Sequence, residues 1–422
     1  MRYFVESYGC TMNYGEGGQL SERMCELGHE ETSSAESADI VILNTCTVVD
    51  TTEKKMVRRM SELRKAGKEV IVTGCMAKVQ ANRASIRLPG SLIVSPDRYS
   101  EFSSEVSGRY GTGCSRAERK HCSNILPIAQ GCLGDCSYCI TKFARGCLSS
   151  YDPDGLVQRF GSIVDGGAKE ILITAQDTGC YGTDIGTDLP SLLGRMLENK
   201  GEFMIMIGMM NPNSLAPIAD GLLEAMKDSR IYRFLHIPVQ SGSDQVLKRM
   251  NRPYSAEEFF SLADKLRSAY PDISISTDLI SGFPGETDED HSKSIELIRR
   301  LKADTVNITR FSSRPGTEAA LMEPVHGRIS KDRSAELTET KNKVELENNS
   351  LVVGRTEEAL ITEAGKEGTM IARTRNYRPV AVPSDLPVGT FVKVEVTSCE
   401  PTYLIGRVLD YRRLHQERTL YN

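Results

Sequence analysis

Residues 129–139 read AQGCLGDCSYC, and this stretch decides how the rest of the chain is interpreted. It places Cys132, Cys136 and Cys139 at C-x3-C-x2-C spacing in one short loop. Thiolates are soft ligands that select zinc, copper(I) or iron–sulfur clusters. A structural zinc site takes four ligands, and no second C-x2-C or H-x3-H pair follows here. Three thiolates instead suit a [4Fe–4S] cluster in which one iron keeps an open position, with a zinc knuckle or unliganded thiols as the alternatives.

Composition is that of an ordinary globular chain. Its 422 residues suggest two to four domains, and 39% of them are hydrophobic and 26% charged. No apolar run approaches the ~20 residues of a membrane span, and no signal peptide is evident. Twelve cysteines in such a chain favour reduced thiols and metal chemistry in the cytoplasm. The net charge of −5 gives no overall sign of nucleic-acid binding, so any RNA contact depends on local basic patches.

The first unit, residues 1–108, is predicted to be a small Rossmann-like α/β domain. Three buried parallel strands alternate with two helices, at residues 2–6, 16–27, 39–44, 53–66 and 69–73. One cysteine follows each strand, namely Cys10, Cys46 and Cys75. Because the loops after parallel strands gather at one sheet edge, these thiols can meet and hold a second iron–sulfur cluster. Cysteines that are merely buried are the alternative.

The middle unit, residues 118–349, follows a polar connection at residues 101–121 and repeats a strand and a helix six times. Strands are expected near residues 125–130, 170–175, 203–209, 232–239, 273–280 and 305–311. Helices are expected near residues 154–165, 189–200, 214–227, 255–268, 287–302 and 332–348. Six units imply a partial (β/α)6, TIM-like barrel with an open side. Chemistry is expected at the C-terminal ends of the strands, where the cysteine loop also lies.

The last unit, residues 351–413, changes to five short β-type runs separated by Gly and Pro, which predicts an OB-like five-stranded barrel. Basic and aromatic residues are interleaved in it: Arg373, Arg375, Arg378, Lys393, Arg407, Arg412 and Arg413 with Tyr377, Phe391, Tyr403 and Tyr411. That combination suits the backbone and bases of RNA. A solvated barrel face with aromatic residues in its core is the alternative.

Together the three units resemble the methylthiotransferase branch of the radical S-adenosylmethionine (SAM) enzymes, with a C-terminal TRAM domain. The cysteine spacing carries the resemblance, with segments at 235–243 (LHIPVQSGS), 248–252 (KRMNR), 282–286 (GFPGE) and 313–317 (SRPGT). Residues 140–146 (ITKFARG), 150–151 (SY) and 176–182 (QDTGCYG) look most like the archaeal and eukaryotic branch. The prenyl-adenosine branch usually has Val-Pro in place of Thr141-Lys142. Cys147 and Cys180 depart from the family pattern, and no role is assigned to them.

The resemblance implies a tRNA methylthiotransferase acting on N6-threonylcarbamoyladenosine at position 37, beside the anticodon. Radical C–H activation, sulfur insertion and SAM-dependent methylation would use two [4Fe–4S] clusters and two SAM molecules per turnover. The implied partners are tRNA and an electron-donor protein, with neither DNA nor a membrane. Prenyl-adenosine tRNA and a ribosomal-protein aspartate are alternative substrates, and an iron–sulfur RNA-binding module is the non-enzyme alternative.

Further residues are assigned to SAM and substrate by the same resemblance. The expected SAM contacts are Tyr138, Gln176, Asp177, Gln240, Ser241, Asp278, Gly282 and Glu286. An aspartate at a strand end is also a common helix N-cap, so a structural role for Asp177 stays open. Lys142 and Arg145 are expected to face the carboxylate of SAM or of the threonyl substituent, because burying an unpaired carboxylate is costly. Arg145 pairing with a surface acid is the alternative.

Overall fold

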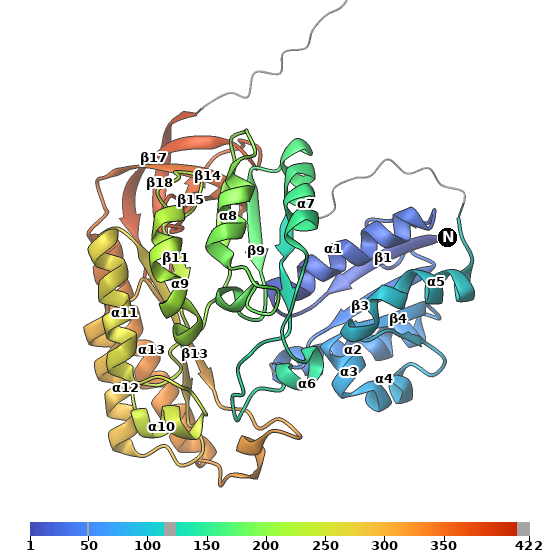
Figure 1. Ribbon diagram of the computed structural model, residues 1–422, viewed down its shortest axis with the longest axis horizontal. Coiled ribbons are helices and arrows are strands. Elements are labelled where there is room, and N and C mark those ends of the chain that lie inside the picture. Colours follow the sequence, from blue (N-terminus) through green and yellow to red (C-terminus); the bar gives the residue numbers. More distant parts are fainter. Residues whose placement is uncertain (49, 114–123, 412–422) are drawn as a thin grey trace, which may run out of the picture.

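Three units follow one another in the computed structural model, which describes residues 1–48, 50–113 and 124–411 (Figure 1). An α/β unit lies beside a half-open barrel of strands and helices, and a small β-barrel sits on one end of that barrel. Among the described residues no helix is both long and apolar enough to cross a membrane. Some positions named above lie outside the described residues: Arg412, Arg413 and the end of the polar connection, residues 114–121.

The N-terminal unit is built on a parallel five-stranded sheet of order β2-β1-β3-β4-β5. Its strands are β1 (Arg2–Ser7), β2 (Glu30–Glu31), β3 (Ile40–Thr45), β4 (Glu69–Gly74) and β5 (Leu92–Ile93). Its helices are α1 (Thr11–Glu26), α2 (Asp50–Lys65), α3 (Cys75–Val79), α4 (Ala81–Arg87) and α5 (Phe102–Tyr110), with a 3-10 turn at Pro96–Glu101. The three apolar strands are confirmed, and the sequence analysis missed β2 and β5, which are too short to show a pattern.

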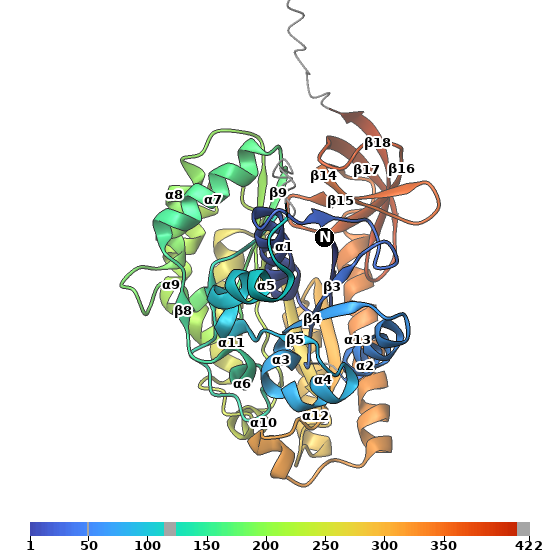
Figure 2. The same cartoon turned by 90° about the vertical axis from the view of Figure 1, so that its right-hand side faces the viewer.

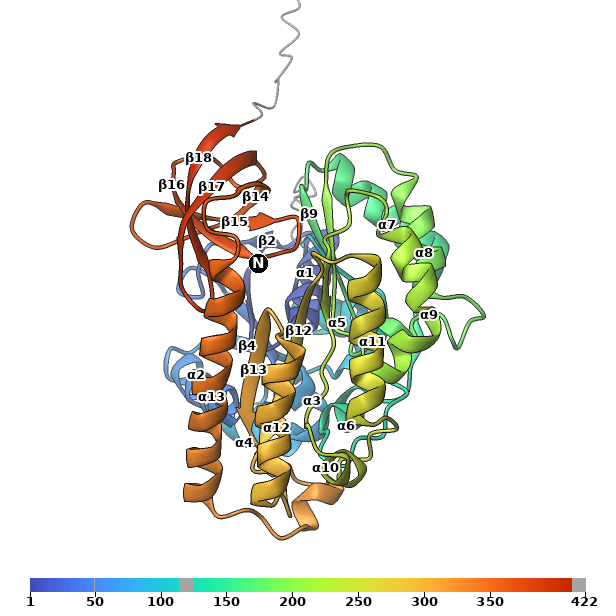
Figure 3. The same cartoon turned by 90° about the vertical axis from the view of Figure 1, so that its left-hand side faces the viewer.

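The middle unit is the predicted partial barrel of six parallel strands. They are β6 (Ile125–Pro127), β9 (Glu170–Thr174), β10 (Met204–Ile207), β11 (Phe234–His236), β12 (Ser274–Ser281) and β13 (Thr305–Arg310). They form two three-stranded sheets, β10-β9-β6 and β11-β12-β13, connected by a bridge between Ile205 and Ile231. Helices lie along the outside (Figure 3): α7 (Pro153–Asp165), α8 (Leu189–Leu197), α9 (Pro212–Ala225), α11 (Ala256–Ala269), α12 (Asp288–Leu301) and α13 (Gly327–Ser350).

Small elements around the cysteine loop were not predicted. Strands β7 (Ala129–Gln130) and β8 (Ser149–Ser150) pair in antiparallel fashion and close the loop at its base. Helix α6 (Thr141–Arg145) follows the loop, and α10 (Asp244–Arg249) packs nearby. The N-terminal unit contacts this region, because α3 touches α6 (Figures 1 and 2).

The C-terminal unit is the predicted closed barrel, of order β14-β15-β16-β18-β17. Its strands are β14 (Thr356–Ala364), β15 (Thr369–Thr374), β16 (Pro379–Pro383), β17 (Phe391–Cys399) and β18 (Leu404–Tyr411). It docks beside the start of β11: the backbone N–H of Arg233 donates to the Arg375 carbonyl at 2.8 Å. This unit therefore lies at the opposite end of the central barrel from α6 (Figure 1).

The docking corrects part of the proposed RNA-binding surface. The ring of Tyr377 packs against Tyr232, with ring centroids 4.8 Å apart, and against Phe234. Arg373 stacks over Tyr377, and Arg378 forms an ion pair with Asp304 at 2.5 Å. These side chains hold two domains together, so Tyr377 is an interface residue and not a platform for a base.

Candidate functional site

The core cysteine loop, residues 132–139, follows β6 and β7 at the C-terminal end of the central barrel. A Cβ placed on Gly134 would lie 3.3 Å from the Cys132 sulfur and 3.7 Å from that of Cys136, so these sulfurs face one space. The Gly134 N–H donates to the Cys132 sulfur at 3.1 Å. Burial, helped by the neighbouring charges of Asp177, Cys136 and Cys139, raises the pKa of Cys132 to about 11, although the Gly134 N–H opposes the rise. The three thiols therefore lie together in a buried place, where their deprotonated, negatively charged forms would need a bound metal as counter-charge.

Backbone contacts fix the shape of the core cysteine loop. Gly131 has φ +78°, and a Cβ there would lie 2.0 Å from the Cys147 carbonyl oxygen, so only glycine fits. Its N–H donates to Gln176 Oε1 at 2.7 Å, which places Gln176 beside the loop as predicted but as a loop support. Ser137 Oγ donates to the Arg249 carbonyl at 2.8 Å, and Asn251 Nδ2 to that of Asp135 at 2.7 Å.

Arg252 is a site residue that the sequence analysis quoted in a motif but did not assign. Its Nη2 donates to the Tyr138 hydroxyl at 2.7 Å and its Nη1 to Asn211 Oδ1 at 2.6 Å. Burial raises the pKa of Cys136, and the Arg252 charge opposes that rise. Arg252 is thus a half-buried cation, with its Nε fully buried, directly beside the core cysteine loop, and the segment 248–252 (KRMNR) was the available signal.

Asp177 is placed differently from the prediction. Its carboxylate accepts hydrogen bonds from Ser214 Oγ at 2.6 Å, Asn211 Nδ2 at 2.7 Å, and the N–H groups of Gly179 and Asn211. A carboxylate has about four acceptor positions, and protein donors fill all four. Asp177 is therefore the N-cap of the 3-10 turn Thr178–Cys180, which was the structural alternative, and its hydrogen bonds favour that role over the predicted contact with the SAM amino group.

Asp278 lies inside the barrel, half-exposed, between two neighbouring strands. It accepts hydrogen bonds from His236 Nε2 on β11 and Asn307 Nδ2 on β13, each at 2.9 Å. Gln240 is held in the left-handed region at φ +76° by backbone bonds to Asp278 and Ile280. Ser241 follows it, buried. The structure thus brings Gln240, Ser241 and Asp278 together at the strand ends, and backbone strain of this kind is often stored at functional sites.

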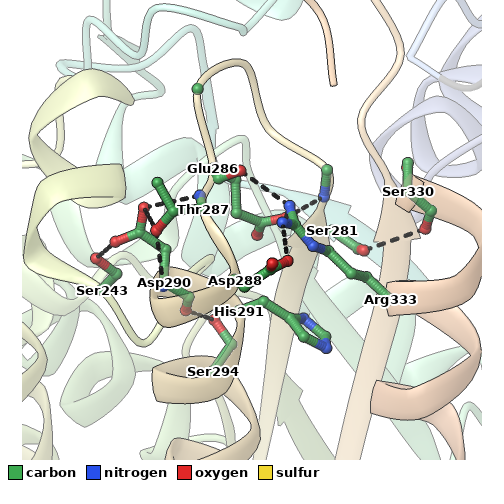
Figure 4. A network of polar contacts seen from close by, with 12 residues as sticks. Ser243, Ser281, Glu286, Thr287, Asp288, Asp290, His291, Ser294, Ser330 and Arg333 are labelled. Carbon is green, nitrogen blue, oxygen red and sulfur yellow. Dashed lines mark hydrogen bonds and ion pairs between the residues drawn. The ribbon is translucent and has the colours of Figure 1, made fainter. Parts of the chain in front are cut away.

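Gly282 and Glu286 belong to a structural network (Figure 4). Glu286 Oε2 accepts from the Gly282 N–H at 2.8 Å and from Arg333 Nη1 at 2.9 Å, and the Glu286 side chain is 1% exposed. Arg333 Nη2 also donates to Asp288 at 2.7 Å. Oxygen Oε2 of Glu286 is therefore held by α13 and by the Gly282 backbone, which favours a structural role, and its assignment to SAM stays a prediction.

Replacing Gly282 with alanine is expected to destabilise the protein. The residue has φ +71°, and a Cβ would lie 2.3 Å from Ser330 Oγ. Left-handed strain and overpacking together cost about 2–5 kcal/mol. Gly316→Ala is the control, because Gly316 has φ +84° but nothing within 4 Å of its Cβ position, so only the strain remains. Urea denaturation should show the larger loss for Gly282→Ala, and equal losses would contradict the packing argument.

The auxiliary cysteine site, Cys10, Cys46 and Cys75, forms at the ends of β1, β3 and β4. A Cβ on Gly9 would lie 2.6 Å from the Cys46 sulfur. Burial, with a contribution from the nearby Cys10 and Cys46, raises the pKa of the Cys75 thiol to about 11, and the Arg145 charge opposes the rise. The three thiols therefore meet at one sheet edge, as their positions in the sequence predicted.

The donor set and its surroundings fit an iron–sulfur cluster. Buried polar atoms without a hydrogen-bond partner, within the described chain, occur on residues near the auxiliary cysteine site: Glu16, Asn44, Thr47, Thr73 and Arg145. In the described ranges no three His, Cys, Asp or Glu side chains surround one metal ion. A four-iron cluster binds each thiolate through a different iron, so its ligands need not converge on one point.

The two cations expected to face substrate lie in different places. Lys142 Nζ pairs with Asp135 at 2.5 Å and stays beside the core cysteine loop. Arg145 is buried and forms an ion pair with Glu16 of the N-terminal unit. The ion pair favours the alternative in which Arg145 meets an acid of the protein, and contact with a substrate carboxylate stays a prediction. Cys180 is buried, with its thiol on the Asp177 carbonyl at 3.0 Å, and Cys147 is exposed.

Family models match three successive stretches of the chain. Residues 2–94 match "Uncharacterized protein family UPF0004", residues 126–298 the radical SAM superfamily, and residues 351–409 the TRAM domain. The fold is similar to that of the radical SAM methyltransferase TsrM from Kitasatospora setae, with a TM-score of 0.55 and 12% identity over 76% of each chain. Fold and cysteine loop together define a radical SAM enzyme, with an iron–sulfur cluster and SAM as cofactors.

Curated relatives extend over the whole chain. Proteins named "Probable threonylcarbamoyladenosine tRNA methylthiotransferase" are 39% identical in Pyrococcus abyssi (97% of this chain, 100% of the relative) and 40% identical in Archaeoglobus fulgidus (97% and 99%). The "Threonylcarbamoyladenosine tRNA methylthiotransferase" of Danio rerio is 33% identical over 100% of this chain and 80% of its own length. The chain belongs to the threonylcarbamoyladenosine tRNA methylthiotransferase family, which confirms the resemblance and the enzyme interpretation.

Proposed function

We propose that this enzyme converts N6-threonylcarbamoyladenosine at position 37 of tRNA to its 2-methylthio derivative. The observation that carries the proposal is the presence of two three-cysteine sites on facing units of one chain, the core cysteine loop and the auxiliary cysteine site. A sulfur-inserting reaction at an aromatic C–H needs a radical source and a sulfur-bearing group close together. Family membership supports the substrate.

The proposed cofactors are two [4Fe–4S] clusters and SAM. When bound, they supply the radical and the methylthio group that the protein itself cannot provide. Cys132, Cys136 and Cys139 would hold the core cluster, and the auxiliary cysteine site would hold the other. Arg252 is the half-buried cation beside the loop, so it is our candidate for the SAM carboxylate. Gln240, Ser241 and Asp278 line the adjoining strand ends and remain candidates for the other polar groups of SAM.

Polar side chains on the open side of the barrel favour a substrate with a polar substituent. Strand β13 is the edge of its sheet, and its residues Asn307, Thr309 and Arg310 are exposed. Lys142 adds a cation next to the core cysteine loop. A threonylcarbamoyl group carries a carboxylate and a hydroxyl that such a wall can bind, whereas a prenyl group offers these polar side chains no hydrogen-bonding atom.

Turnover on two tRNAs tests the substrate assignment. We expect methylthiolation of threonylcarbamoyladenosine tRNA and little activity on prenyl-adenosine tRNA, because a site built for polar contacts rejects an analogue that lacks them. Lys142→Gln should reduce kcat/KM for the first tRNA by roughly tenfold or more, the value of one charge-assisted hydrogen bond. The matched control is Lys227→Gln, because Lys227 also pairs with an acidic side chain, Glu224, but follows the end of α9. A preference for the prenyl substrate would refute the assignment.

A basic groove offers a path for the tRNA backbone. A cavity of about 780 Å³ lies between the central barrel and the C-terminal barrel. Its lining has a surplus of basic over acidic side chains: Arg233, Arg267, Arg300, Lys302, Arg355, Arg375 and Arg378 against Asp272, Asp304 and Glu357. Arg375 and Arg378 come from the C-terminal barrel and the first four cations from the central unit, so both units would contribute to RNA binding.

Charge removal in this groove is expected to weaken tRNA binding and its salt dependence. Lys302→Gln, Arg355→Gln and Arg375→Gln together should lower the slope of log K against log salt by about 0.7–0.9 for each phosphate that is no longer neutralised. The control with the same charge change is Lys227→Gln, Lys265→Gln and Lys293→Gln, on exposed lysines elsewhere. Fluorescence anisotropy over a salt series measures the affinity and the salt slope of each variant. An unchanged slope in the groove variant would move the RNA path elsewhere.

A further inference from the structure

One buried guanidinium connects the two cysteine sites. Arg145 is the last residue of α6, which begins two residues after Cys139. Its side chain is 1% exposed and forms an ion pair with Glu16 on α1, across the interface between the two units. The side chain therefore starts at the core cysteine loop and ends inside the N-terminal unit.

Arg145 holds two of the auxiliary cysteine turns through one asparagine. Its Nη2 donates to Asn13 Oδ1 at 2.6 Å. Asn13 Nδ2 in turn donates to the carbonyl of Tyr8 at 2.7 Å and to that of Thr45 at 2.8 Å. These carbonyls lie just before Cys10 and Cys46, so the guanidinium orients the group that shapes both turns.

Arg145 also lies close to the third cysteine. Cys75 is the first residue of α3, and α3 packs against α6, of which Arg145 is the last residue. Among the described residues Arg145 Nε and Glu16 Oε2 are buried and have no hydrogen-bond partner. One donor, Arg145 Nε, and one acceptor, Glu16 Oε2, are therefore available for a further hydrogen bond beside the three thiols.

The charge has a defined consequence for a cluster bound there. A guanidinium stays protonated, and electrostatic interactions are stronger in a buried site than in water. Positive charge and hydrogen bonds to ligand sulfur favour the reduced cluster. We propose that Arg145 is a positioning residue that ties the auxiliary cysteine site to the core cysteine loop and raises the reduction potential of the auxiliary cluster, with Glu16 limiting the rise. This inference rests on the two-cluster proposal above.

The test measures the potential of the auxiliary cluster alone. In the full chain carrying Cys132→Ala, Cys136→Ala and Cys139→Ala, only the auxiliary cysteine site can hold a cluster. After anaerobic reconstitution with iron and sulfide, a redox titration followed by electron paramagnetic resonance gives its midpoint potential. In this parent we expect Arg145→Gln to lower the potential, Glu16→Gln to raise it, and Arg145→Lys to fall between Arg145→Gln and the parent.

Opposite signs separate an electrostatic role from general loosening of the interface. Arg159→Gln is the matched control, because Arg159 on α7 also pairs across the interface, with Glu22 of α1 at 2.8 Å, and within the described chain makes no contact with a cysteine turn, so it should leave the potential unchanged. Shifts of the same sign in Arg145→Gln and Glu16→Gln, or an Arg159→Gln shift as large as that of Arg145→Gln, would overturn the inference. If Arg145→Gln fails to take up iron, the sign of the Glu16→Gln shift decides. A parent without a cluster would refute the two-cluster proposal instead.

Discussion

Replacing Cys132, Cys136 and Cys139 with alanine is expected to abolish SAM cleavage and to halve the iron, from about eight to about four per chain. These thiols lie together beside Arg252 and Tyr138. Among the described residues, Cys180 is the other ligand candidate near the core cysteine loop, but it is buried and its thiol donates a hydrogen bond to a backbone carbonyl. Iron analysis and detection of 5′-deoxyadenosine after anaerobic reconstitution measure the two effects.

The control removes thiols that belong to neither site, with Cys25→Ala and Cys399→Ala. It should retain both the iron and the SAM cleavage. Zinc in place of iron in the unaltered protein, or cleavage that survives removal of the core cysteines, would contradict the assignment of the loop.

The complementary change, Cys10, Cys46 and Cys75 to alanine, is expected to halve the iron as well but to leave SAM cleavage measurable. The reason is spatial: these thiols belong to the N-terminal sheet, whereas the core cysteine loop is held by contacts from the central barrel, such as Ser137 with Arg249 and Asn251 with Asp135. Methylthiolation of tRNA should be abolished.

Comparing the two triple variants gives a clear pattern. One is deficient in both cleavage and methylthiolation, and the other only in methylthiolation. If the auxiliary variant kept methylthiolation activity, the auxiliary cysteine site would be a structural feature and the sulfur would have to enter by another route.

Elements whose cause is local could be predicted from the sequence. The apolar runs at residues 39–44 and 69–73 predicted β3 and β4, and the topology of a parallel sheet then placed Cys46 and Cys75 at one edge. The same reasoning placed the core cysteine loop after the first barrel strand. In each case one segment carries the signal, and general rules of chain topology supply the rest.

The sequence could not show the distant partners of several assigned residues. Arg145 pairs with Glu16, which lies 129 positions earlier in the chain, and Glu286 pairs with Arg333 on α13, which lies 47 positions later. No local pattern distinguishes a carboxylate that binds SAM from one that a helix far along the chain neutralises. Asp177 is a similar case, because the residues that donate hydrogen bonds to its carboxylate, Asn211 and Ser214, come from the next strand–helix unit. Tyr377 was interpreted as an exposed aromatic because the docking of the C-terminal barrel is a tertiary property.

The most direct test of the central claim is mass spectrometry of tRNA nucleosides from a host that lacks the protein, complemented with the unaltered chain or with the variant in which Cys10, Cys46 and Cys75 are alanine. The account predicts that 2-methylthio-N6-threonylcarbamoyladenosine appears only with the unaltered chain, while N6-threonylcarbamoyladenosine accumulates in the other two samples. A methylthio group found only on prenyl-adenosine, or the same nucleosides in all three samples, would contradict it.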